Sequence, residues 1–272
     1  MTANIIFVLS NGRTGSTLLC QALKNYQHTI NFNEALFLTS NDLFYADINF
    51  GNFLCNNIKI DMLSKNELKN KLLDNPIKLL STISDYYVND TIIVKLHLHQ
   101  FRFLSDKMSN WIFSQPNHKF ILLKRTNYLE KYVSEVIAEQ SNIWQNGDTT
   151  DVKIKIDIPD YIMKTNKRKQ QYDKIEQDLN NHDIDALLVE YDKDLKHYDN
   201  NDFINLVDPW VKRIGLDLQL GKVPTMTANR QNTNENIFDN IINHEEIREL
   251  IKNIDKLNTD LIDKRSKTCY NK

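Results

Sequence analysis

The fold is decided by the stretch "IIFVLSNGRTGSTLLCQAL", residues Ile5–Leu23. Its apolar and largely β-branched beginning, Ile5–Leu9, predicts a buried strand. A polar loop with Gly12 and Gly15 follows, and residues from Thr17 to Asn25 have the apolar spacing of a helix. A strand, a glycine loop and a helix in this order are typical of an α/β fold with an anion at the loop.

Short apolar runs alternating with helical patterns continue along the chain. Strands are expected at residues 28–32, 91–96, 119–123 and 185–190. Helices are expected at 129–143, 163–180, 203–214 and 245–257, with Pro209 as a kink or boundary in the third. Runs that are apolar on both faces predict a parallel sheet covered by helices. We therefore expect a P-loop-like, three-layer α/β sandwich with a central, mainly parallel sheet flanked by helices.

The domain organisation is expected to be simple. No internal repeat and no linker rich in proline, glycine or serine divides the sequence, so residues 1–272 are interpreted as one domain. Residues 145–180 are interpreted as a helical insertion or flap. The helix at 163–180 is so polar that we expect it to be exposed.

Composition excludes several classes of protein. The net charge of −2 argues against a surface devoted to nucleic acid, although a local basic pocket for a small anion is compatible with it. The basic cluster of Lys153, Lys155 and residues 164–169 is interpreted as a solvated helix face.

The N-terminal run and the cysteines both indicate the compartment of the protein. The apolar N-terminal run is too short for the core of a signal peptide or for a membrane span. Cys20, Cys55 and Cys269 are odd in number and far apart, which disfavours a disulfide framework or a zinc site. We expect a cytoplasmic protein in a reducing compartment.

The glycine loop suits a phosphate group. Its backbone amides can point inward at Gly12, Arg13, Thr14, Gly15, Ser16 and Thr17. The positive end of the following helix, the guanidinium of Arg13 and the two hydroxyls would add to this anion site. The structural alternative is a plain strand–turn–helix corner with Ser16 as the N-cap.

The loop departs from the pattern of nucleoside triphosphatases. Gly12 and Gly15 stand closer together than in G-x-x-x-x-G-K-[ST], and the lysine is missing. That lysine and a magnesium ion are central to triphosphate chemistry. The sequence offers no convincing acidic strand end for the metal, and Glu190 is the nearest candidate. The loop therefore favours a mononucleotide-type anion over Mg·ATP.

At this point two motifs carry a family resemblance. "RTGSTLL" resembles the 5′-phosphosulfate loop of sulfotransferases that use 3′-phosphoadenosine 5′-phosphosulfate (PAPS). "FILLKRTNYLEKYVSEVIAEQSNIW", Phe120–Trp144, is similar to their second motif, which implies that Arg125 and Ser134 bind the 3′-phosphate. The interval between these two residues is one position longer than in many cytosolic members. Without the match, Ser134 is a serine on a helix surface.

Two later segments extend the resemblance from Phe7 to about Ile247. "ALLVEYDKDL", Ala186–Leu195, is similar to the family's strand-to-helix segment. "PTMTANRQNTNENIFDNIINHEEI", Pro224–Ile247, resembles a late loop and helix of bacterial carbohydrate sulfotransferases. This match implies that Arg230, Gln231 and Asn232 close over the nucleotide. Residues 153–180 match nothing in the family.

The resemblance implies an enzyme that transfers a sulfuryl group from PAPS to a hydroxyl, leaves adenosine 3′,5′-bisphosphate and uses no metal. The trehalose 2-sulfotransferase-like branch implies a carbohydrate or another small hydroxylated acceptor as the partner, rather than nucleic acid or a membrane. Members of this fold often form homodimers. Lys95 and Arg13 would stabilise the transferred group by charge.

Two residues compete as the base that takes the acceptor's proton. Glu34, in the apolar setting of "NFNEALF", resembles the glutamate base of the trehalose-type enzymes, and we favour it. His97 resembles the histidine base of cytosolic sulfotransferases, and histidine as a residue type suits a base near neutral pH. Lys95, His97 and His99 are expected on one face of a strand. A weak metal site there is the minor alternative.

Other functions stay open. A P-loop kinase or nucleotide hydrolase would need Mg·ATP, which the missing lysine disfavours. A non-catalytic nucleotide-binding module would have the same fold without a base, whereas both Glu34 and His97 are present.

Overall fold

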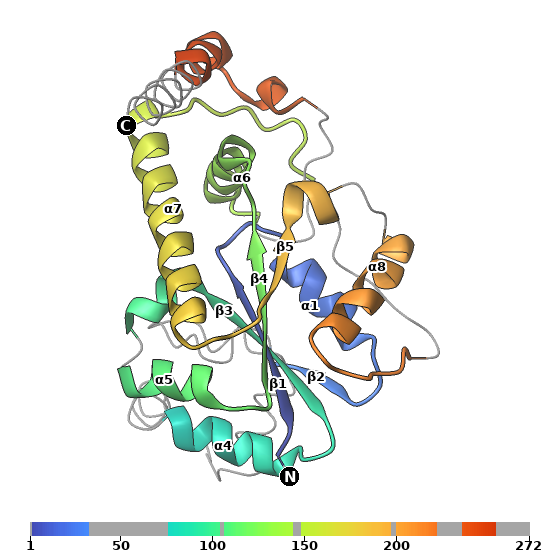
Figure 1. Cartoon of the computed structure of the whole chain (residues 1–272). Coiled ribbons are helices and arrows are strands. Elements are labelled where there is room, and N and C mark those ends of the chain that lie inside the picture. Colours follow the sequence, from blue (N-terminus) through green and yellow to red (C-terminus); the bar gives the residue numbers. More distant parts are fainter. Residues whose placement is uncertain are drawn as a thin grey trace, which may run out of the picture. The chain divides into compact units, whose positions relative to one another are not determined.

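The computed structural model describes residues 2–32, 76–103, 106–143, 148–196, 200–221 and 236–253 (Figure 1). By its internal contacts the chain divides into two units, Met1–Asn127 with Lys167–Ala228, and Tyr128–Asn166 with Asn229–Lys272. The single domain over residues 1–272 stays a prediction. None of the helices in the described ranges combines the length and the apolar composition that a membrane span requires.

The first unit is built on a sheet of five strands, all parallel within the described residues. They are β1 (Asn4–Ser10), β2 (Thr29–Asn31), β3 (Thr91–His97), β4 (His118–Lys124) and β5 (Leu187–Glu190), in the order β2-β3-β1-β4-β5. Every strand expected from the sequence is present. The expected α/β sandwich with a parallel central sheet is therefore confirmed.

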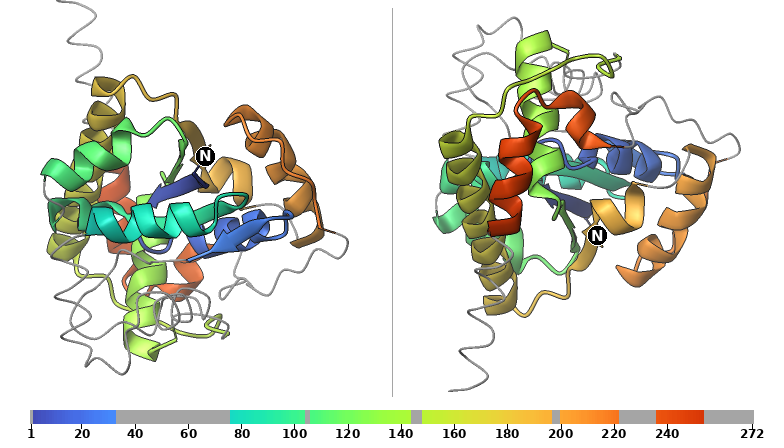
Figure 2. Two further views of the ribbon diagram at one scale, coloured as in Figure 1. Left: turned by 90° about the horizontal axis from the view of Figure 1, so that it is seen from below. Right: turned by 90° about the horizontal axis from the view of Figure 1, so that it is seen from above.

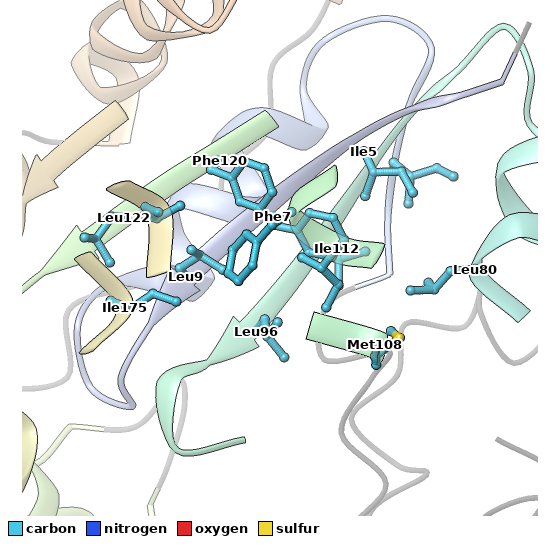
Figure 3. Close-up of a cluster of buried hydrophobic side chains, with 14 of the residues drawn as sticks. Ile5, Phe7, Leu9, Leu80, Leu96, Met108, Ile112, Phe120, Leu122 and Ile175 are labelled. Carbon is cyan, nitrogen blue, oxygen red and sulfur yellow. The ribbon is translucent and has the colours of Figure 1, made fainter. Parts of the chain in front are cut away.

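One face of this sheet is covered by α4 (Pro76–Tyr86), α5 (Asp106–Ser114) and the C-terminal half of α7 (Ile158–Asn181). Ile5, Phe7 and Leu9 of β1 point into this core, because side chains alternate between the faces of a strand (Figure 3). The rings of Phe7 and Phe120 stack with centroids 5.5 Å apart. The sequence patterns did not predict α4 and α5.

The opposite face packs on α1 (Ser16–Lys24) and α8 (Asn200–Arg213), which lie beside each other in both views of Figure 2. Ile6 and Val8 of β1 supply this second core from the alternate positions of the strand. Pro209 lies inside α8, so its interpretation as a helix boundary was wrong. Helices on both faces make the first unit three layers deep.

The expectation of an exposed helix at residues 163–180 was wrong. Tyr172, Ile175 and Leu179 of α7 are buried in the core of the first unit. Their spacing of three and four residues forms one apolar stripe on a helix that is otherwise polar. The expectation of a solvated basic face was wrong at Arg168, which is 7% exposed.

The second unit has its own small core. It joins α6 (Tyr128–Ser141), the first turns of α7, η4 (Ile237–Asn240) and a helix at residues 244–253. Two asparagines tie its separate segments together. The side-chain amide of Asn240 donates to the carbonyls of Thr150 and Val152, at 2.9 and 2.8 Å. Asn243 exchanges two hydrogen bonds with the backbone of Ile156.

Candidate functional site

The central strands of the first unit end together at one edge of the sheet. Ser10 at the end of β1 stands in register with His97 of β3 and with Leu123 of β4. The strands are parallel, so the loop after β1, residue 98 onward and Arg125 follow at this same edge. In open parallel sheets, ligands bind outside the carboxyl ends of the strands.

The loop after β1 turns through two left-handed residues. Gly15 has φ +80° and Arg13 has φ +60°. The sequence pattern led us to expect Gly12 and Gly15 to make the turn, but Gly12 lies outside the left-handed region and no described atom lies within 4 Å of where its Cβ would stand. The buried hydroxyl of Thr14 donates to the carbonyl of Asn11 at 2.7 Å, which holds the loop closed.

The first turn of α1 has amides that no N-cap side chain satisfies. Gly15 is the N-cap, because the amide of Leu19 donates to its carbonyl at 3.0 Å. The structural alternative of Ser16 as the N-cap was therefore wrong. Since Gly15 has no side chain to cap with, the positive end of the helix is left open to an anion.

Lys95 brings a second positive charge to this place. The ammonium of Lys95 donates to Thr17 Oγ1, in the first turn of α1, at 3.5 Å. Only 3% of this residue is exposed. An anion that lies between this ammonium and the helix end would interact favourably with both positive charges.

Arg125, directly after β4, contacts the same loop. Its Nη1 donates to the carbonyl of Arg13 at 3.1 Å, and this hydrogen bond stabilises the left-handed turn. Its guanidinium lies 4.6 Å from the centroid of the Tyr191 ring, and its Nε lies 3.5 Å from Asp192 Oδ1. The arginine is thus oriented by three groups.

Tyr191 and Asp192 are site residues that the motifs did not single out. They open the helical turn η3 (Tyr191–Leu195) after β5. Asp192 Oδ2 accepts from the amide of Asn127 at 2.8 Å, and the Tyr191 ring packs directly on Gly15. The end of β5 therefore connects the end of β4 to the glycine loop. The "EYD" segment after a buried strand was the available signal, but its contacts depend on strand order.

His97 is held in one tautomer. Its Nδ1 lies 3.3 Å from the carbonyl of Ser10, and a carbonyl only accepts, so Nδ1 must carry the proton. The lone pair of the neutral ring is then on Nε2. His99 stacks on His97 with centroids 5.6 Å apart. However, His99 lies in η2 (Leu98–Phe103), so the expectation that it shares the strand with Lys95 and His97 was wrong.

The remaining predicted residues are distributed as follows. Ser134 lies on α6, in the second unit, whereas Arg125 is in the first, so their joint contact with a phosphate stays a prediction. Glu34, Arg230 and Gln231 lie outside the described residues. Within the described ranges, no group of three or more His, Cys, Asp and Glu could hold a metal ion.

The described residues define an α/β protein with a glycine loop, a buried lysine and an oriented arginine at the carboxyl edge of a parallel sheet. No protein-family model matches the chain, and no curated protein gives a significant match. A function is therefore proposed from the side chains at the carboxyl edge of the sheet.

Proposed function

We propose that the protein is a sulfotransferase that moves the sulfuryl group of PAPS to a hydroxyl group of a carbohydrate or another small acceptor. The observation that carries this proposal is the position of Lys95, whose buried ammonium meets the open positive end of α1 at Thr17. An anionic group of the donor would compensate both charges at once.

The same contact disfavours the kinase or hydrolase alternative. In triphosphatases, the hydroxyl at the position of Thr17 binds the magnesium ion. Here the ammonium of Lys95 lies 3.5 Å from that hydroxyl oxygen, where a divalent cation would be repelled. A donor that is used without a metal, such as PAPS, fits this charge distribution better than Mg·ATP.

Each cation then has a distinct role. Arg13 and Lys95 would neutralise the 5′-phosphosulfate. Arg125 and Ser134 would bind the 3′-phosphate. Arg230 and Gln231 would close over the nucleotide. The three groups that orient Arg125 reduce the entropy that it would lose on binding. A base must also accept the proton of the acceptor hydroxyl.

Of the two candidate bases, His97 has a geometry that supports the role. With Nδ1–H directed at the carbonyl of Ser10, the lone pair that would take the proton lies on Nε2. Glu34 stays the other candidate. The turnover of Glu34→Gln and His97→Gln variants distinguishes them, because only loss of the true base abolishes transfer. A non-catalytic nucleotide-binding module would show no transfer in the wild type.

Replacement of Lys95 by methionine tests the proposed donor site. Met keeps the apolar stem and removes the ammonium, so the affinity for adenosine 3′,5′-bisphosphate should fall about ten- to a hundredfold, from the loss of about 1.5–3 kcal/mol. Titration calorimetry measures this change. Lys212→Met is the matched control, since Lys212 lies on α8 with 67% of its side chain exposed. An unchanged dissociation constant for Lys95→Met would refute the proposed role of this lysine.

A further inference from the structure

Three neutral side chains at the carboxyl edge of the sheet each hold a buried polar atom with no hydrogen-bond partner within the described residues. These atoms are Ser10 Oγ, Asn11 Nδ2 and Gln100 Nε2, in residues that are 0%, 4% and 4% exposed. Folded proteins leave few such atoms, because each loses its bonds to water without replacement. Their concentration in one place indicates a ligand that supplies hydrogen-bond acceptors.

These residues are joined through His97. Ser10 stands opposite His97 in the strand register, and its carbonyl faces His97 Nδ1 at 3.3 Å. Gln100 Oε1 accepts from the backbone amide of His97 at 2.8 Å. This bond fixes the oxygen of the Gln100 amide toward the backbone, so its nitrogen is the group left to donate. Asn11 directly follows Ser10.

Ser10, Asn11 and Gln100 lie between the loop that would hold the donor phosphate and the candidate base, His97. Asn11 is the first residue of the loop whose amides would hold the donor phosphate, and Gln100 is bonded to the residue of the candidate base. In a transfer reaction, the group that moves must pass from the donor phosphate to the acceptor near the base. The unpartnered donors therefore lie where this group would be transferred.

We propose that Asn11 Nδ2 and Gln100 Nε2, assisted by the hydroxyl of Ser10, bind the peripheral oxygens of the sulfuryl group during transfer. This inference rests on the proposed function. In the step, the bond from sulfur to the phosphate oxygen breaks, and adenosine 3′,5′-bisphosphate leaves with its electron pair. A bond forms from the acceptor oxygen to sulfur, and the hydroxyl proton passes to His97 Nε2. Neutral donors hold the sulfuryl group without competing with the cations for the phosphates.

PAPS and adenosine 3′,5′-bisphosphate test the inference directly, because they differ by the sulfuryl group alone. For Asn11→Ala and Gln100→Ala, we expect the affinity for PAPS, measured by calorimetry without acceptor, to fall about tenfold. The affinity for the bisphosphate should stay unchanged. Asn117→Ala is the matched control. Asn117 donates to the carbonyl of Ala3, which precedes β1 and so lies at the other end of this strand from the site, and its replacement should alter neither affinity.

Thermal unfolding of the free variants separates a binding role from a structural one. Asn11→Ala removes no hydrogen bond made by the side-chain amide nitrogen, so its Tm should not fall. Asn117→Ala removes a hydrogen bond that is made, so its Tm should fall.

The outcomes distinguish this inference from the proposed function. If the wild type does not bind the bisphosphate, the proposed function fails, and the inference with it. If the wild type binds it but neither variant changes the ratio of the two affinities, the inference is overturned and the proposed function stands. An equal loss of both affinities would make Asn11 and Gln100 residues that only shape the loop, which also overturns the inference.

Discussion

At the residue scale, Arg13 and Gly15 turn the loop, and Gly15 has a second role. A Cβ at Gly15 would lie 2.6 and 2.8 Å from two ring carbons of Tyr191. The left-handed φ of +80° adds a conformational cost for any residue with a side chain. Gly15 is thus required by the contact of the glycine loop with Tyr191 of η3 as well as by the turn.

Gly15→Ala should therefore lower the free energy of unfolding by about 2–4 kcal/mol, as the sum of overpacking and left-handed strain. Gly12→Ala is its control. No described atom lies within 4 Å of the added methyl group, and we expect a change within about 0.5 kcal/mol. Urea unfolding of both variants measures the difference. Equal stabilities would show that Tyr191 does not constrain the loop.

His118 gives the protein a specific sensitivity to acid. Burial lowers the pKa of this histidine to about 4, although its Nδ1 donates to the carbonyl of Ile112 at 2.7 Å. The unfolded chain takes up the proton near pH 6.5, whereas the folded protein resists it until about pH 4. The contribution of His118 to stability is therefore complete above pH 6.5 and is lost as the pH falls toward 4.

Between pH 7 and 4.5, His118 should account for a loss of about 2–3 kcal/mol in the free energy of unfolding. His118→Phe should remove this part of the decline, although the variant is less stable at neutral pH because Ile112 loses its donor. His244→Gln, at a partly exposed histidine, should retain it. Urea unfolding at the two pH values measures both. The same decline in His118→Phe as in the wild type would contradict the assignment.

At the scale of elements, α7 shows how a polar helix contributes to a core. Tyr172, Ile175 and Leu179 are its buried stripe in the first unit, while most of its other positions are polar. A stripe of this kind needs only one apolar residue per turn. The helix was predicted correctly from the sequence, but its burial was not, because overall polarity conceals such a stripe.

Ile175→Ala should lower the free energy of unfolding by about 2–4 kcal/mol, since it leaves a cavity against the sheet. Met163→Ala on the same helix removes a side chain of a residue that is 61% exposed, and should change stability by less than about 0.5 kcal/mol. Chemical denaturation compares the two variants. A small loss for Ile175→Ala would mean that the helix does not anchor on the sheet.

At the scale of the whole molecule, the sequence predicted what local patterns determine. The strands within the described residues follow from short apolar runs, and the site loop follows from its glycines and its position after β1. The contacts of the site were not predictable in the same way. Lys95 reaches Thr17 because β3 pairs with β1, and Tyr191 reaches Gly15 because strand order brings β5 beside β4. Such contacts depend on pairing between distant segments.

A nucleotide screen by thermal shift tests the central claim most directly. By linkage, adenosine 3′,5′-bisphosphate at a hundredfold over its Kd should add about 2.7 kcal/mol to the free energy of unfolding and raise the Tm without added metal. ATP with Mg²⁺ should give a smaller shift, because the ammonium of Lys95 lies beside Thr17, where the metal would bind. A shift with Mg·ATP and none with the bisphosphate would contradict the claim that this edge of the sheet binds the PAPS nucleotide.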